Sequence, residues 1–123
     1  MNMKIEEFVN KAKKQDKRNA FSLFEGKLVN IPIEISEFYK NYNPVDVEIR
    51  TKRFGNIWFC PVEKIYEIKS EYYFYPDSVF IFATTNGDPI FMENGKIYTS
   101  YESDYSPEFI ANSLDDFFNS CFI

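Results

Sequence analysis

The sequence of 123 residues contains no histidine and only two cysteines. Histidine is the commonest general base in enzymes and the commonest metal ligand. Its absence, together with the scarcity of cysteine, leaves almost nothing from which to build a zinc or copper site. Any catalysis would have to use carboxylates, Lys, Tyr or Ser. We therefore expect no metal site, and the absence of histidine ranks an enzyme below a binding protein.

The two cysteines lie in apolar stretches. Cys60 is part of "IWFCPV" and Cys121 is part of "FFNSCFI". A free cysteine in such surroundings behaves as a small hydrophobic residue, and disulfides are rare in cytosolic proteins. We predict two buried thiols that are neither bridged nor nucleophilic.

Long apolar runs are also missing. No stretch approaches the roughly 18 uninterrupted apolar residues that indicate a transmembrane helix. The first residues, "MNMKIEEFVNKAKK", carry charges throughout and have neither the apolar core nor the cleavage site of a signal peptide. The sequence thus predicts a cytoplasmic protein that is not bound to a membrane.

Positive charge is in deficit, with 14 Lys and Arg against 19 Asp and Glu, a net charge of −5. This is the wrong sign for a protein that must neutralise the phosphates of nucleic acid, or an acidic membrane surface. A basic protein partner fits the charge, although moderate acidity is also ordinary for a soluble protein. We expect a protein partner and no direct contact with nucleic acid.

Aromatic residues, in contrast, are abundant. The chain has 14 Phe and 9 Tyr, and 45% of its residues are hydrophobic. A chain of this length can bury a core without metal or disulfide bonds. We predict one domain over residues 1–123, with an interior built from rings.

Hydrophobic periodicity predicts helices in four places. Residues 4–14 carry an apolar face that includes Phe8, and "PIEISEFYKNY" carries another from Pro32 until Asn43-Pro44 ends it. A short helix is expected after Pro61. The residues expected to face inward there are Val62, Ile65 and Tyr66.

The last helix is expected near the C-terminus. Ser106 is a suitable cap, Pro107 suits a first turn and Glu108 complements the helix dipole. Its predicted buried face consists of Phe109, Ala111 or Ile110, Leu114, Phe117 and Phe118.

Strand signals fill the middle of the chain. "VDVEIR" alternates Val45, Val47 and Ile49 with charged residues, and "IWFC" follows the turn signal Gly55-Asn56. Residues 79–84, 89–93 and 96–100 form a predicted meander, because "TNGD" and "ENGK" contain the Asn-Gly pairs typical of hairpins. The whole predicts an α+β fold, a central and mainly antiparallel sheet flanked by N- and C-terminal helices.

Four motifs in this order resemble the SMI1/KNR4 domain of the SUKH superfamily. They are "IPIEISEFYKNYNP", "IWFCPVEKIYEI", "VFIFATTNGDPIFMENGKIYTSY" and "IANSLDDFFNSCF", and the resemblance is strongest over residues 28–122. The chain departs from many relatives in having Asn43-Pro44 where they have Asn-Gly, and in lacking a histidine in "YTSYES".

The resemblance implies a protein that acts by binding. Most bacterial members are immunity proteins, which neutralise a cognate toxin, often a nuclease, of a polymorphic or contact-dependent system. Eukaryotic relatives are regulatory or scaffolding proteins in cell-wall signalling, so a non-enzymatic domain that binds a cellular protein is the alternative. Neither branch is known for enzymatic activity or for an obligate cofactor.

Asp88, directly after Asn86-Gly87, has three interpretations. Asn, Gly and Asp are turn residues, so Asp88 can simply turn the chain. Asp88 and Glu93, expected near one end of the sheet, can also offer negative charge to a basic partner. A carboxylate pair for glycoside hydrolysis would need two carboxyl groups about 5 to 10 Å apart. We expect a turn, with any functional role being recognition.

The aromatic residues indicate where a partner could bind. Trp58, Tyr72, Tyr73, Tyr75, Tyr98 and Tyr101 cannot all be core, because a tyrosine hydroxyl needs water or a hydrogen-bond partner. In "KIYTSY", alternation places Ile97 and Tyr98 on opposite faces. Aromatic residues are favoured anchors of interfaces. We predict an acidic and aromatic partner-binding surface made of Asp46, Glu48, Trp58, Asp88, Glu93, Tyr98, Tyr101 and Glu102.

Overall fold

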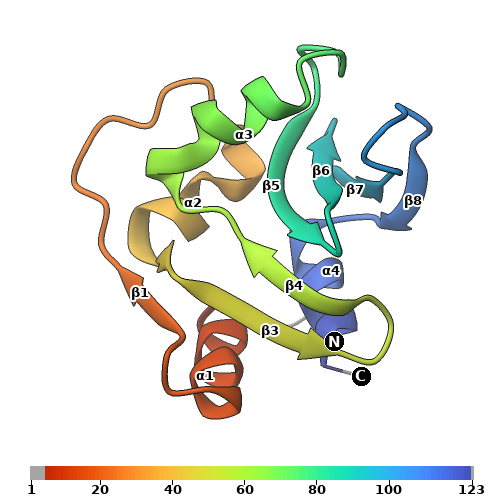
Figure 1. The fold of residues 1–123 in the computed structure, drawn as a ribbon. Helices are drawn as coiled ribbons and strands as arrows, with labels where there is room; N and C mark the ends of the chain where they lie inside the picture. Colours follow the sequence, from red (N-terminus) through yellow and green to blue (C-terminus); the bar gives the residue numbers. More distant parts are fainter. Residues whose placement is uncertain (1–4, 123) are drawn as a thin grey trace.

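The computed structural model describes residues 5–122, and the fold is α+β, as predicted (Figure 1). Lys4, the first residue of the first predicted helix, lies outside the described residues. The helices are α1 (Ile5–Gln15), α2 (Ile33–Asn41), the 3₁₀-helix η1 (Val62–Lys64), α3 (Ile65–Glu71) and α4 (Leu114–Cys121). The strands are β1 (Ala20–Ser22), β2 (Asn43–Val45), β3 (Val47–Thr51), β4 (Gly55–Phe59), β5 (Phe80–Thr85), β6 (Asp88–Glu93), β7 (Lys96–Thr99) and β8 (Glu108–Ala111).

The main sheet has six strands in the order β3-β4-β5-β6-β7-β8, and all neighbouring pairs are antiparallel. Strands β1 and β2 form a separate two-stranded sheet. Because each strand of the main sheet pairs with the next one in the chain, β3 and β8 are its two edges (Figure 1).

One face of the sheet packs on α1, α2 and α4 through a core of rings. Phe8, Phe59 and Phe118 are fully buried there, and the rings of Phe8 and Phe118 stack with centroids 3.9 Å apart. Most of the remaining ring pairs in this core are tilted or edge-on, the arrangements that aromatic quadrupoles favour. The predicted ring-filled interior is confirmed.

The other face carries a smaller cluster under α3 and the segment that follows it. Ile68 of α3, Tyr72 and Tyr75 pack there against Ile81 and Phe91 of the sheet. Both faces of β5 are therefore covered, which explains why its sequence, "FIFATT", is an apolar run rather than an alternation.

The two Asn-Gly pairs form the hairpin turns of the predicted meander. Asn86 and Gly87 have φ values of 53° and 87°, and Asn94 and Gly95 have 53° and 79°. Positive φ at both central residues is the geometry of the two-residue turn that suits twisted strands.

The helix predicted from Ser106 is wrong in its first half. Residues 108–111 form β8, which pairs with β7, and Phe109 is 54% exposed instead of buried on a helix face. The helix begins at Leu114, and the Ser113 hydroxyl caps it by accepting a hydrogen bond from the Asp116 N–H at 3.1 Å. Pairing along β7 has overridden the local helix-start signals at Ser106 and Pro107.

Two smaller expectations are also wrong. Val45 belongs to β2 and is 47% exposed, because Asp46, with a φ of 63°, breaks the alternation before β3 begins at Val47. Tyr66 of α3 is 83% exposed, so it does not face inward.

Candidate partner-binding surface

Asp88 turns the chain and also holds a distant loop. It begins β6 at the Asn86-Gly87 turn, and its Oδ1 accepts a hydrogen bond from the Glu102 N–H at 3.0 Å. The Tyr72 hydroxyl donates to the Gly87 carbonyl at 2.6 Å. The β5–β6 turn is thus connected to the β7–β8 loop and to the segment after α3.

Gly87 cannot be replaced without disturbing this junction. Its φ of +87° is strained for an L-residue, and a Cβ there would lie 2.9 Å from the Glu102 carboxylate. The same proximity shows that Glu102 lies directly against the turn.

Hydrogen bonds with the side chains of Tyr75 and Ser100 hold the backbone of the β7–β8 loop. The Tyr75 hydroxyl lies 2.9 Å from the Tyr101 carbonyl and 2.6 Å from the Asp104 carbonyl. Ser100 Oγ donates to the Asp104 carbonyl at 2.8 Å and accepts from the Ser106 N–H at 2.8 Å. With its backbone held in this way, the loop presents the side chains of Tyr101, which is 68% exposed, and Glu102 to solvent.

The buried tyrosines therefore serve as tethers. Tyr72 and Tyr75 are buried, whereas Tyr73 is 84% exposed, in line with the expectation that the tyrosines could not all be core. Burial, followed by the nearby Glu102 carboxylate, raises the pKa of Tyr72 to about 12. Burial likewise raises the pKa of Tyr75, so both hydroxyls stay protonated and able to donate at neutral pH.

Tyr98 lies in an aromatic row across three strands. Its ring stacks on Phe91 of β6 with centroids 5.8 Å apart and meets the edge of Phe109 of β8 at 6.1 Å. Ile97 is buried on the opposite face, so the predicted alternation is confirmed. Phe109 was missed as a surface residue because it was assigned to a helix, although "EFIA" beside β7 is compatible with a strand.

Glu93 does not lie near Asp88, so that expectation is wrong. The two residues occupy opposite ends of β6, five residues and thus about 16 Å apart. Glu93 accepts hydrogen bonds from Ser78 Oγ at 2.7 Å and from the Tyr105 hydroxyl at 3.2 Å. The separation exceeds that of a glycosidase carboxylate pair, so these two residues do not form one.

Asp46, Glu48 and Trp58 lie toward the β3 edge of the sheet, although Trp58 packs against the same cluster as Tyr98. Glu48 of β3 pairs directly with Trp58 of β4, and both Asp46 and Glu48 are exposed. Four strand spacings, about 19 Å, separate β3 from β7, and three, about 14 Å, separate β4 from β7. The predicted surface therefore falls into two parts. We call Asp88, Tyr98, Tyr101, Glu102 and Phe109 the β7–β8 patch, and Asp46, Glu48 and Trp58 the β3–β4 patch.

The two patches differ in their electrostatic surroundings. Residues 70–123 contain nine Asp or Glu and one basic residue, Lys96, whereas residues 1–69 contain 13 Lys or Arg and ten Asp or Glu. Near the β3–β4 patch, Arg18 pairs with Asp16 at 2.9 Å, and Asp16, then Asp46 and Glu48, raise the pKa of the guanidinium. Acidic residues thus outnumber basic ones in the half of the sequence that contains the β7–β8 patch, and four of them, Asp88, Glu102, Asp104 and Glu108, belong to β6, the β7–β8 loop and β8.

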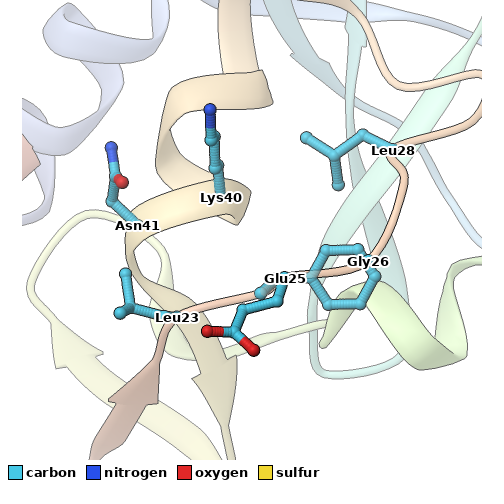
Figure 2. A pocket seen from close by; sticks show the side chains of 7 residues that line it. Leu23, Glu25, Gly26, Leu28, Lys40 and Asn41 are labelled. Carbon is cyan, nitrogen blue, oxygen red and sulfur yellow. The ribbon is translucent and has the colours of Figure 1, made fainter.

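Two hollows lie elsewhere on the surface. One, of about 710 Å³, lies between residues 23–28 and the end of α2, where Lys40 and Asn41 project beside Leu23 and Leu28 (Figure 2). The other, of about 910 Å³, lies between residues 24–32, α3 and residues 75–81. Each contains a single carboxylate side chain, Glu25 in the first and Asp77 in the second. Neither hollow offers the two convergent carboxylates of a glycoside hydrolase.

The cysteines are free and buried, as predicted. Burial raises the pKa of Cys60 to about 12, and it raises that of Cys121 as well. Both are therefore protonated thiols at neutral pH, and the thiol is a much weaker nucleophile than the thiolate.

Among residues 5–122, no three Cys, Asp or Glu side chains are grouped so that they could hold a metal ion. None of the helices in this part of the chain is both long enough and apolar enough to span a membrane.

The order of elements and the sequence agree with one family. Residues 18–120 match the family model of the SMI1 / KNR4 family (SUKH-1). The chain belongs to the SMI1/KNR4 family. The match reaches further toward the N-terminus than the expected stretch, residues 28–122, and it takes in β1 and the loop before α2. No curated protein matches the chain. SMI1/KNR4 domains are generally non-enzymatic binding domains, and the family is known for immunity proteins.

Proposed function

We propose that this SMI1/KNR4 domain is a cytoplasmic immunity protein that binds and neutralises one cognate bacterial toxin of a polymorphic or contact-dependent system. The whole chain acts as one domain, without a cofactor, and covers the toxin instead of transforming a substrate. A basic nuclease is the toxin class that fits its charge best, because such an enzyme must itself attract phosphates.

The β7–β8 patch carries this proposal. Tyr101 and Phe109 are large, exposed anchors, Glu102 follows Tyr101 in the sequence, and no Lys or Arg follows Lys96. Because Asp88 and Tyr75 already hold the loop, little conformational entropy remains to be lost on binding. The acidic surroundings steer a basic partner toward the patch and accelerate association.

Co-expression with the toxin encoded in the adjacent open reading frame tests this function. The wild-type chain should restore growth to cells that produce the toxin, and the two proteins should co-purify as a stable complex. A Tyr101→Ala/Glu102→Lys variant should protect poorly, whereas a Tyr73→Ala/Glu67→Lys variant, altered at exposed positions on and just after α3, should protect fully. Failure of the wild-type chain to protect would refute the proposal.

A regulatory or scaffolding domain is the second candidate. The groove of about 910 Å³ favours it, because exposed Val29 and Tyr66 line this groove and neither belongs to the β7–β8 patch. In that case no toxin gene would lie beside this one. A cellular protein captured by the chain would bind wild type and Glu102→Lys equally and would be lost on Val29→Asp/Tyr66→Asp substitution.

A further inference from the structure

The two edges of the six-stranded sheet are not equivalent. The β3 edge is closed by side chains: Gln15 Oε1 accepts from the Arg50 N–H at 2.6 Å, and Gln15 Nε2 donates to the Arg50 carbonyl at 2.8 Å. Asn19 Oδ1 accepts from the Glu48 N–H at 2.9 Å. These amides occupy the positions that a further strand would use, so β3 cannot be extended without displacing them.

The β8 edge has no such cover. Within residues 5–122, the backbone of Glu108–Ala111 forms hydrogen bonds with β7 on one side and with no residue on the other. An edge strand directs alternate N–H and C=O groups outward, where they can pair with another chain. In β8 the register with β7 shifts between Phe109 and Ala111, so Ile110 is an extra residue and the regular alternation applies to Glu108 and Phe109. Glu108 and Phe109 are exposed, so solvent, and hence a partner, can reach the first half of this strand, whereas the side chains of Ile110 and Ala111 are buried.

Charge determines which kind of strand fits this edge. Glu102, Asp104 and Glu108 are all exposed around it, and no Lys or Arg follows Lys96 in the sequence. A second copy of this chain would bring the same carboxylates to the edge, which like-charge repulsion disfavours. A strand that carries Lys or Arg is complementary.

We propose that the β8 edge binds an extended, Lys- or Arg-bearing segment of the protein partner, which adds to the sheet as a seventh strand. Backbone hydrogen bonds supply affinity in this mode, and alternate side chains supply specificity. Side chains on one face contact Phe109 and Tyr98, and basic side chains lie near Glu108, Glu102 or Asp104. The proposal rests on the proposed function, since the segment belongs to the toxin.

A synthetic peptide tests the edge without the toxin. The ¹⁵N-labelled full chain would be titrated with the peptide Lys-Val-Lys-Thr-Lys-Val, and amide chemical shifts recorded. The largest shifts should map to residues 108–111 and their neighbours on β7. The acidic peptide Glu-Val-Glu-Thr-Glu-Val should not bind. Alternate amides of an extended peptide point in opposite directions, so two versions of the basic peptide would be made, each N-methylated on one set of alternate amides. The version whose methylated amides face β8 should bind at least tenfold more weakly.

Matched charge reversals separate the edge from a general charge effect. Glu108→Lys should weaken the basic peptide at least fivefold, whereas Glu67→Lys, which makes the same change on an exposed position of α3, should leave its affinity within twofold. Three results would overturn the proposal. They are no binding at millimolar peptide concentration, chemical-shift changes confined to the groove beside α3, and equal effects of the two variants on peptide affinity.

The toxin complex distinguishes this proposal from the proposed function. If the chain protects cells and forms the complex, but the β8 amides exchange with deuterium as fast as in the free chain, the edge proposal fails and the immunity function stands. If the peptide binds β8 but the chain does not protect, the immunity function fails and the edge remains a site for basic strands.

Discussion

Strands β3 and β8 both occupy edges, and both mix charged with apolar residues, "VEIRT" against "EFIA". They differ in what the neighbouring segments supply. Gln15 ends α1 and Asn19 follows it, so their amides reach the β3 backbone. The residues after β8 instead lead to α4, which packs on one face of the sheet and leaves the edge free. Whether the outer backbone groups of an edge strand are free to pair with another strand thus depends on the neighbouring segment, and the strand's own sequence does not decide it.

The largest effect on this comparison is expected from Asn19→Ala. Asn19 is buried, donates to the Ala12 carbonyl at 2.8 Å and accepts from the Glu48 N–H at 2.9 Å. Its removal leaves two backbone groups without partners, so we expect a loss of about 2–3 kcal/mol in the free energy of unfolding, measured by urea denaturation. Asn112→Ala, at an exposed position just after β8, is the control and should change stability by less than about 0.5 kcal/mol. Equal losses would contradict the account.

The next largest effect is expected at Tyr72, whose hydroxyl holds the β5–β6 turn on the side of the sheet that leads to β8. Tyr72→Phe removes the hydrogen bond to the Gly87 carbonyl and should cost about 1–1.5 kcal/mol at neutral pH. Exposed Tyr73→Phe is the matched control and should be neutral. Since the pKa of Tyr72 is raised to about 12 in the folded state, its stabilising contribution is complete below the unfolded value of about 10.

This contribution should disappear as the pH rises from 10 through 12. The difference in unfolding free energy between wild type and Tyr72→Phe should shrink over that window. A difference that stays constant to pH 12 would show that folding does not raise the pKa of Tyr72.

Gln15→Ala should expose the backbone of the β3 edge with a smaller loss in the free energy of unfolding. Gln15 is half-buried, so water can replace both of its hydrogen bonds to Arg50, and we expect a loss of about 1 kcal/mol. The Arg50 amide should exchange with deuterium faster than in wild type. Gln15→Glu keeps the acceptor but loses the donor, and so should fall between the two. Unchanged exchange at Arg50 would mean that Gln15 does not guard this edge.

The smallest effect on stability is expected at the open edge. Glu108→Lys should change the unfolding free energy by less than about 0.5 kcal/mol, because Glu108 is exposed. The same variant should weaken the toxin complex at least tenfold at low salt, and this difference should decrease as salt screens the charges. A complex as tight as that of wild type at every salt concentration would contradict the role of this edge.

The elements with strong local signals could be predicted from the sequence. The meander follows from two Asn-Gly pairs, and α1 follows from the spacing of Phe8, Val9 and Ala12. Strand β8 could not be recognised, because Ser106-Pro107-Glu108 carries the signals of a helix start and only pairing with β7 overrides them.

The candidate site was predictable in composition but not in arrangement. Asp88, Tyr98, Tyr101 and Glu102 lie in one region, but the contact between Asp88 and the Glu102 N–H spans 14 residues, and no local pattern encodes it. The distance from Asp46, Glu48 and Trp58 to this region depends on strand order. Glu93 lies at the far end of β6 because the strand runs from Asp88 to Glu93.

Amide hydrogen exchange, measured residue by residue on the free chain and on its complex with the toxin encoded beside it, tests the central claim most directly. In the free chain, the Glu48 and Arg50 amides should be protected, while outward-facing amides among residues 108–111 should exchange quickly. In the complex, those β8 amides should become protected and the β3 amides should not change. Protection of β8 in the free chain, or unchanged β8 exchange in a formed complex, would contradict the account.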